Sequence, residues 1–197
     1  MATARTYHHG NLRAALLESA ERTLRRRGAS ELSLRELARE VGVSHAAPRR
    51  HFADKQALLD ALAEHGFERL GRELDASMGA AGDSLRAKLG AFARAYVAFA
   101  TRHAALLDLM FAGKHRPDAD RVRAAANAAF AGPLALFASA QRSGEIVGED
   151  PERVGTVALA TLQGLASLAN NGMLGAEGLD ELVEEAVDRL VLGLRPR

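Results

Sequence analysis

The chain has 197 residues, of which 48% are hydrophobic and 26% are charged, and none is cysteine. The missing cysteines exclude disulfides and thiolate metal sites, and no stretch approaches the roughly eighteen uninterrupted apolar residues of a membrane span. Abundant Ala, Leu, Arg and Glu, with few β-branched and aromatic residues, favour helix over sheet.

Positive charge gathers at the N-terminal end. Residues 1–55 hold 11 Arg and Lys against 6 Asp and Glu, a balance of +5, whereas residues 56–197 hold 15 against 19, or −4. This asymmetry suggests that one end meets a polyanion, although a solvated basic surface explains the charge alone equally well. The N-terminal residues lack the apolar core of a secretory signal, so we expect a cytoplasmic, nucleoid-associated location.

The first residues with helical periodicity follow an arm. Residues 1–10 show no pattern and are expected to be flexible, touching DNA or remaining an uninvolved tail. With Asn11 as its N-cap, an amphipathic helix is predicted to run to Gly28, after three basic residues that suit a helix C-terminus. Ser33 and Glu36 form a capping box that opens a second helix.

Turn signals then come in quick succession. Gly42 is expected to stop the second helix, and Ser44 is expected to cap a short third helix reaching about residues 51–52. Pro48 lies at the end of that helix's first turn and is interpreted as tolerated there. Asp54 is predicted to cap a fourth helix that continues to about residue 74.

The rest of the chain predicts further helices. Residues 75–83, DASMGAAGD, are expected to form a linker-like break. Gly132-Pro133 is expected to kink or divide the helix that contains it. The predicted helical stretches are 83–102, 104–112, 118–143, 151–171 and 179–194.

Residues 34–52, LRELAREVGVSHAAPRRHF, have the pattern of a helix-turn-helix. Ala38 is small where a second helix must cross closely, and Gly42 supplies the positive φ that such a turn needs. With the helix before it, the aromatic-basic HF ending and the following Asp54-Lys55-x-x-Leu58-Leu59, this stretch resembles the N-terminal domain of the tetracycline-repressor (TetR) family. The resemblance covers residues 7–70.

The resemblance implies an all-α fold in two parts. Residues 1–56 would be a three-helix DNA-binding domain, its fourth helix linking on to about residue 74, and residues 75–197 would be a helical effector-binding and dimerisation domain. The segment from residue 44 would enter the major groove. Arg49 replaces the family's usual aromatic residue, so it is expected to contact either phosphate or guanine. The DNA-binding set is predicted to be Ser33, Arg35, Ser44, His45, Ala46, Ala47, Arg49, Arg50, His51 and Lys55.

We hypothesise that operator preference depends on Arg35 and His45, and on Arg49 if its guanidinium reaches a base, with methyl contacts from Ala46 and Ala47 to thymine. The resemblance implies a ligand-responsive repressor that binds a palindromic operator as a homodimer. The two half-sites of the operator would be about one helical turn of DNA apart, roughly 34–36 Å. The same chain could instead activate transcription. A helical protein-interaction module with an incidental basic face is the rival class.

Two sets of residues are assigned to the C-terminal part. Large apolar residues of the middle helices are candidates for an effector pocket suited to a mostly apolar ligand, although each could be core: Phe92, Tyr96, Phe99, Met110, Phe111, Phe130 and Phe137, with Gln163 beside them. Apolar stripes of the last two helices are candidates for a dimer interface, with intrachain core as the alternative: Val154, Val157, Thr161, Leu165, Leu182, Ala186 and Leu190.

Catalytic and metal chemistry is not expected. The sequence has no nucleophile elbow, no phosphate-cradling glycine loop and no H-E-x-x-H. Its 7 histidines lack the spacing of metal ligands. We therefore expect no enzyme activity, no metal and no cofactor.

Overall fold

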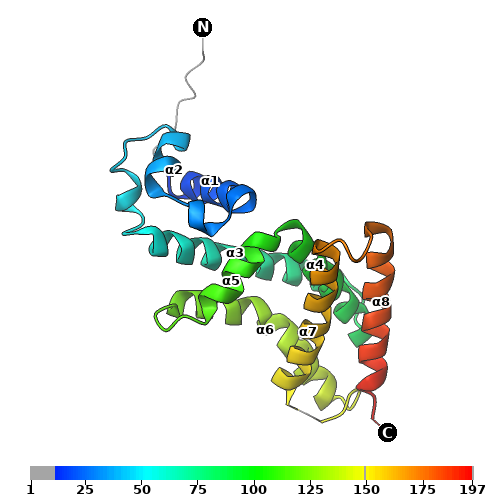
Figure 1. Ribbon diagram of the computed structural model, residues 1–197. Coiled ribbons are helices and arrows are strands. Elements are labelled where there is room, and N and C mark those ends of the chain that lie inside the picture. The colour runs from blue at the N-terminus through cyan, green and yellow to red at the C-terminus, as the bar shows by residue number, and fades with distance from the viewer. Residues whose placement is uncertain (1–11, 149, 197) are drawn as a thin grey trace.

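The computed structural model describes residues 12–148 and 150–196, and the regular structure within these ranges is entirely helical, as predicted (Figure 1). The expected arm and the Asn11 cap lie outside the described residues. Eight α-helices follow one another: α1 (Leu12–Arg27), α2 (Leu34–Val41), α3 (Lys55–Gly79), α4 (Leu85–Arg102), α5 (Ala104–Lys114), α6 (Asp120–Arg142), α7 (Pro151–Asn170) and α8 (Ala176–Gly193). No helix in these ranges is long and apolar enough to cross a membrane.

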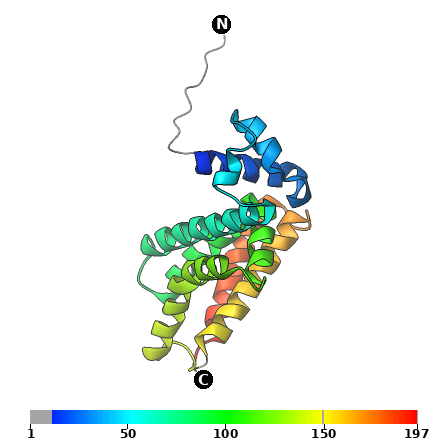
Figure 2. The same ribbon diagram turned by 90° about the vertical axis from the view of Figure 1, so that its left-hand side faces the viewer.

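Helices α1 and α2 and the start of α3 form a small head (Figure 2). Leu16, Leu37 and Leu58 are fully buried between them. The buried hydroxyl of Ser19 donates to Glu40 Oε2 at 2.5 Å, which ties α1 to α2. Gly42 ends α2 with φ 77°, the positive value predicted for this turn. The hydrogen bond and the shared core thus join the first two helices of the head.

The prediction of a third α-helix at residues 44–52 is wrong. Only the 3₁₀ turn Pro48–Arg50 forms there, preceded by a single turn closed by the bond from Ala47 N to Ser44 O at 2.9 Å. Pro48 has no N–H to donate to the carbonyl of Ser44, and its ring would clash with that carbonyl in an α-helix. Pro48 is buried, so it anchors the segment through packing instead.

The break predicted at residues 75–83 begins too early. Helix α3 continues to Gly79, and Ser84 caps α4 by accepting from Ala87 N at 3.2 Å. Met78 is buried, and Ser77 Oγ donates to Ala91 O at 3.0 Å. The burial of Met78 and the hydrogen bond of Ser77 to α4 outweigh the low helix propensity of the sequence DASMG. The break is therefore confined to residues 80–84.

Helix α3 is the central element of the body and packs against α4, α5 and α6. A Cβ placed on Gly71 would lie 3.0 Å from the Cα of Ala129, so the backbones of α3 and α6 are nearly in contact. The sequence predicted that Gly132-Pro133 would either kink or divide its helix. Helix α6 is not divided and continues through Pro133. The buried Pro133 ring occupies the interior side of that helix.

Helices α7 and α8 lie side by side on α4 (Figure 1). The guanidinium of Arg86 on α4 contacts Glu184 at 2.7 Å and Asp188 at 2.9 Å, and Arg94 also contacts Glu184. The hydrogen bond from Arg86 is the main reason that the pKa of Glu184 is lowered. Ion pairs thus add to the apolar packing of the buried Val183 and Val187.

One polar cluster joins the head to the body. Arg69 on α3 donates two hydrogen bonds, of 3.0 and 3.1 Å, to the carboxylate of Glu21 on α1. The Arg69 guanidinium lies 5.3 Å from the centre of the Phe99 ring. The centre of the His103 ring is 4.9 Å from the centre of the same Phe99 ring. His103 Nδ1 is 3.5 Å from Glu21 Oε1. Burial, followed by the charge of Arg69, lowers the pKa of His103, so we treat this ring as neutral.

We predict that Glu21→Gln destabilises the chain by about 1–3 kcal/mol, because it leaves the largely buried Arg69 guanidinium without its counter-charge. Urea unfolding measures this loss. Glu18→Gln is the control, since Glu18 is an exposed residue of the same helix. Equal midpoints for both variants would show that the Glu21–Arg69 pair contributes nothing.

A second prediction concerns pH. Because the pKa of His103 is lowered by folding, the folded chain binds this proton more weakly than the unfolded chain does. The contribution of His103 to stability is therefore complete above the unfolded pKa of about 6.5 and is lost as the pH falls below it. Unfolding free energies measured from neutral to mildly acid pH should decline less steeply for His103→Gln. Parallel declines would contradict this assignment.

Candidate nucleic-acid interface and ligand cavity

A hollow opens on the head between α2, the turn before it and the segment that precedes α3. Three permanent cations surround it, namely Arg35, Arg49 and Lys55, and all three are exposed. Ser33, His45 and Ala46 also line it. Six of the ten predicted DNA-binding residues are thus brought together on one surface, although they come from three separate elements.

Two hydrogen bonds shape this hollow. Asp54 caps α3, as predicted, and its carboxylate accepts from Ala57 N at 2.8 Å. Lys55 Nζ donates to Ser30 O at 2.6 Å, which holds its ammonium beside the 3₁₀ turn Ala29–Glu31. Ser33 stands at the N-cap of α2, but its hydroxyl makes no capping bond, contrary to the predicted capping box. That hydroxyl is therefore available to an external acceptor such as a phosphate oxygen.

A second hollow adjoins the first and adds a cation that the sequence analysis overlooked. Arg39 lines it together with Arg35 and His45. Arg39 is one helical turn after Arg35 on α2, so the i, i+4 spacing was the available signal. Glu31 and Glu36 also line this second hollow. Its two cations are therefore matched by two carboxylates, whereas the first hollow has three cations against the single carboxylate of Asp54.

The other four predicted residues lie outside both hollows. Ser44 and Arg50 are exposed, and Ala47 is half-buried at the start of the Pro48 turn. His51 faces away and lines a separate hollow with Arg13 and Asp60. Residues 44–52 do not form a continuous α-helix, and successive side chains of a 3₁₀ turn are rotated by a different angle than those of an α-helix. These four positions are therefore separated from the residues that line the hollows.

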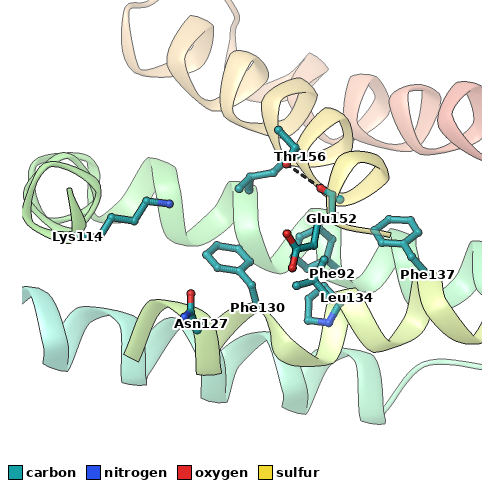
Figure 3. A pocket seen from close by; sticks show the side chains of 11 residues that line it. Phe92, Lys114, Asn127, Phe130, Leu134, Phe137, Glu152 and Thr156 are labelled. Atoms are coloured by element: carbon teal, nitrogen blue, oxygen red, sulfur yellow. Dashed lines mark hydrogen bonds between the residues drawn. The ribbon is translucent and has the colours of Figure 1, made fainter. Parts of the chain in front are cut away.

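A cavity of about 300 Å³ lies in the body between α4, α5, α6 and α7 (Figure 3). Three of the predicted pocket residues line it: Phe92, Phe130 and Phe137. Leu134 and Leu159 extend this apolar wall. Pro133 and Gly155 also line it, as do four polar residues that the sequence did not single out: Lys114, Asn127, Glu152 and Thr156.

The structure places the other predicted pocket residues in the core around this cavity. Phe99 and Met110 are fully buried. Tyr96 is also fully buried, and its hydroxyl donates to Gln163 Oε1 at 2.5 Å, while burial raises the pKa of the phenol. Phe111 packs edge-on against Phe67 at 5.8 Å. Only the tertiary structure could separate core aromatics from lining ones, since both share the same helical periodicity.

The candidate dimer residues divide between core and surface. Val154 is only 5% exposed within its own chain, whereas Val157 is 61% exposed. Thr161, Leu165, Leu182, Ala186 and Leu190 are half-buried. Among the described residues, the exposed large hydrophobic side chains are Val157, Leu168, Met173 and Leu192, all on α7, α8 or the turn between them.

Metal ligation finds no support in the part of the chain that the structure describes. Within residues 12–148 and 150–196, no three side chains of His, Cys, Asp or Glu are close enough together to hold an ion. His103, for example, is surrounded by an aromatic ring and an Arg–Glu pair rather than by other ligands.

Both parts of the chain match family profiles of known proteins. Residues 16–62 match the profile described as bacterial regulatory proteins, tetR family, and residues 89–192 match the profile described as tetracyclin repressor-like, C-terminal domain. The HTH-type transcriptional regulator BetI of Brucella anthropi is 34% identical over 67 residues, which span 34% of this chain and 34% of that protein. The chain therefore spans about a third of the length of the curated relatives it matches.

Solved structures have a similar fold along nearly the whole length of this chain. A protein of unknown function from Rhodococcus sp. RHA1 is 47% identical, with a TM-score of 0.90, over 98% of this chain and 100% of that one. A TetR family transcription regulator from Marinobacter aquaeolei VT8 is 21% identical, with a TM-score of 0.78, over 95% and 97%. At that identity the second structure supports the fold alone.

Mutations in the first hollow should separate base reading from phosphate binding. We predict that Arg35→Ala weakens DNA binding by about 1–3 kcal/mol and relaxes sequence preference, whereas Lys55→Ala weakens binding to all sequences and reduces the salt slope by about one. Fluorescence anisotropy at several salt concentrations, with selection of preferred sites, measures both effects. Arg22→Ala, an exposed arginine of α1 outside both hollows, is the control. If Arg35→Ala behaves like this control, the surface is assigned wrongly.

Proposed function

Because the chain belongs to the TetR family of DNA-binding transcriptional regulators, we propose that it is a repressor that binds a palindromic operator as a homodimer and is released by a small effector. The observation that carries this proposal is the grouping of Arg35, Arg49 and Lys55 around one exposed hollow of the head. Phosphate contacts by such cations provide affinity, and side chains reaching base edges provide preference.

The separation of the two candidate sites supports a ligand-responsive mechanism. The hollow belongs to the head, and the cavity lies between α4, α5, α6 and α7 of the body, so an effector would not compete directly with DNA. We retain the proposed division into residues 1–56 and 75–197, with α3 as the shared element. An effector that binds one arrangement of the two parts more tightly shifts the population toward it.

Two contacts can transmit such a shift. Helix α3 begins at the hollow with Lys55 and passes beside the cavity helices α4, α5 and α6. The Glu21–Arg69 ion pair holds α1 to α3 next to Phe99 of α4. A displacement of α4 by a ligand would therefore reach the head through this cluster.

The exposed apolar surface supports dimerisation. Val157 and Leu168 on α7 are separated by three helical turns and face solvent in the isolated chain. Exposed apolar residues grouped on two neighbouring helices are typical of a subunit interface. Two copies meeting through α7 and α8 would form a four-helix bundle, with one head for each operator half-site.

We expect Val157→Arg to convert the dimer into monomers and to lower affinity for a palindromic operator far more than for a single half-site. Light scattering after size exclusion measures the mass, and a gel shift with DNA flanking its own gene measures binding. Ala76→Arg, an exposed position near the end of α3, is the control. A chain that remains dimeric after Val157→Arg, or that ignores duplex DNA at low salt, would overturn the corresponding part of the proposal.

A further inference from the structure

Lys114 differs from the other half-buried basic residues in the described part of the chain. It lies in the last turn of α5 and lines the cavity, and no described carboxylate forms an ion pair with it. The remaining half-buried Arg and Lys side chains all lie within 3.6 Å of a carboxylate oxygen: Arg69, Arg86, Lys88, Arg116 and Arg123. The cavity thus contains a partly desolvated cation without a full counter-charge.

The neighbours of Lys114 explain its position but do not neutralise it. Its Nζ is 4.9 Å from the centre of the Phe111 ring, which attracts a cation through the ring quadrupole. The carbonyl end of α5 also favours a positive charge, although it supplies only about half an elementary charge. A buried or half-buried cation is most stable with an anionic partner that also accepts its hydrogen bonds. An anion supplied by a ligand would complete the site.

The opposite side of the cavity has the reverse charge. Figure 3 shows Lys114 and Asn127 on one side of Phe130, and Glu152 with Phe137 on the other. The carboxylate of Glu152 forms no ion pair with any described residue, so a second anion at that side would be repelled. Apart from Asn127 and Thr156, the rest of the lining is apolar.

The size of the cavity limits the ligand further. At about 300 Å³ the cavity is at the lower end of ligand pockets, which are commonly about 300–1,000 Å³. The wall formed by Phe92, Phe130 and Phe137 suits a hydrocarbon or aromatic body.

We propose that the effector is a small apolar molecule with a single carboxylate, which pairs with Lys114 while the apolar part packs on Phe130 and the other aromatic side chains. This assignment rests on the proposed function, in which the cavity is the effector site. Asn127 on the same side of Phe130 can donate a hydrogen bond to the second carboxylate oxygen. Glu152 then selects against molecules with an anion at both ends.

The test uses three probes that share one body and differ only in the head group: phenylbutyrate, phenylbutanol and phenylbutylamine. Isothermal titration calorimetry on the full chain, at up to millimolar probe, should show phenylbutyrate binding about tenfold more tightly than phenylbutanol, because only the carboxylate pairs with the charge of Lys114. Any binding of phenylbutylamine should depend on Glu152 and not on Lys114. Lys114→Met should remove this preference. Glu152→Gln should preserve or increase it.

Lys88→Met is the matched control, because Lys88 is another half-buried lysine but pairs with Asp83 outside the cavity. Circular dichroism and probe-free operator binding on the same samples show whether each variant is folded. Equal affinities for the three probes, retention of the preference in Lys114→Met, or no binding by any probe would overturn this inference. Failure of the unmodified chain to bind operator DNA would instead overturn the proposed function, since it is measured without probe.

Discussion

The structure depends on the burial of one long helix. Leu58, Leu62, Phe67, Leu70 and Leu74 on α3 are at most 1% exposed, and this single helix contributes to the cores of both head and body. Completely burying a large apolar side chain contributes about 1.5–3 kcal/mol. The two parts therefore cannot separate without exposing residues of α3.

Polar contacts determine how the head is oriented on this helix. The two-fold hydrogen bonding between Arg69 and Glu21 fixes α1 beside α3, and the aromatic face of Phe99 lies against the same guanidinium. Arginine suits this position because its planar fork can bind a carboxylate and stack on a ring at once. These contacts bring together Glu21 of α1, Arg69 of α3 and Phe99 of α4, although Glu21 and Arg69 are 48 residues apart in the chain.

The cavity shows why a family resemblance does not by itself identify a ligand. Periodicity selects apolar positions, and Phe92, Phe130 and Phe137 do line the cavity. The residues that discriminate between ligands are polar ones at helix ends, Lys114 at the end of α5 and Glu152 at the start of α7. Along the sequence each is an ordinary charge that complements a helix dipole. Their common site arises because α5 and α7 pack around α6.

The amino-acid sequence by itself determined the helical class, most helix ends and the DNA-binding motif, because caps, glycine turns and apolar periodicity are local properties. Only the tertiary structure decided the rest. Packing against α4 extends α3 through a segment with weak helix propensity. The choice between core and cavity for the aromatic residues, and between core and surface for Val154 and Val157, depends on contacts between helices distant in sequence, which local spacing does not encode.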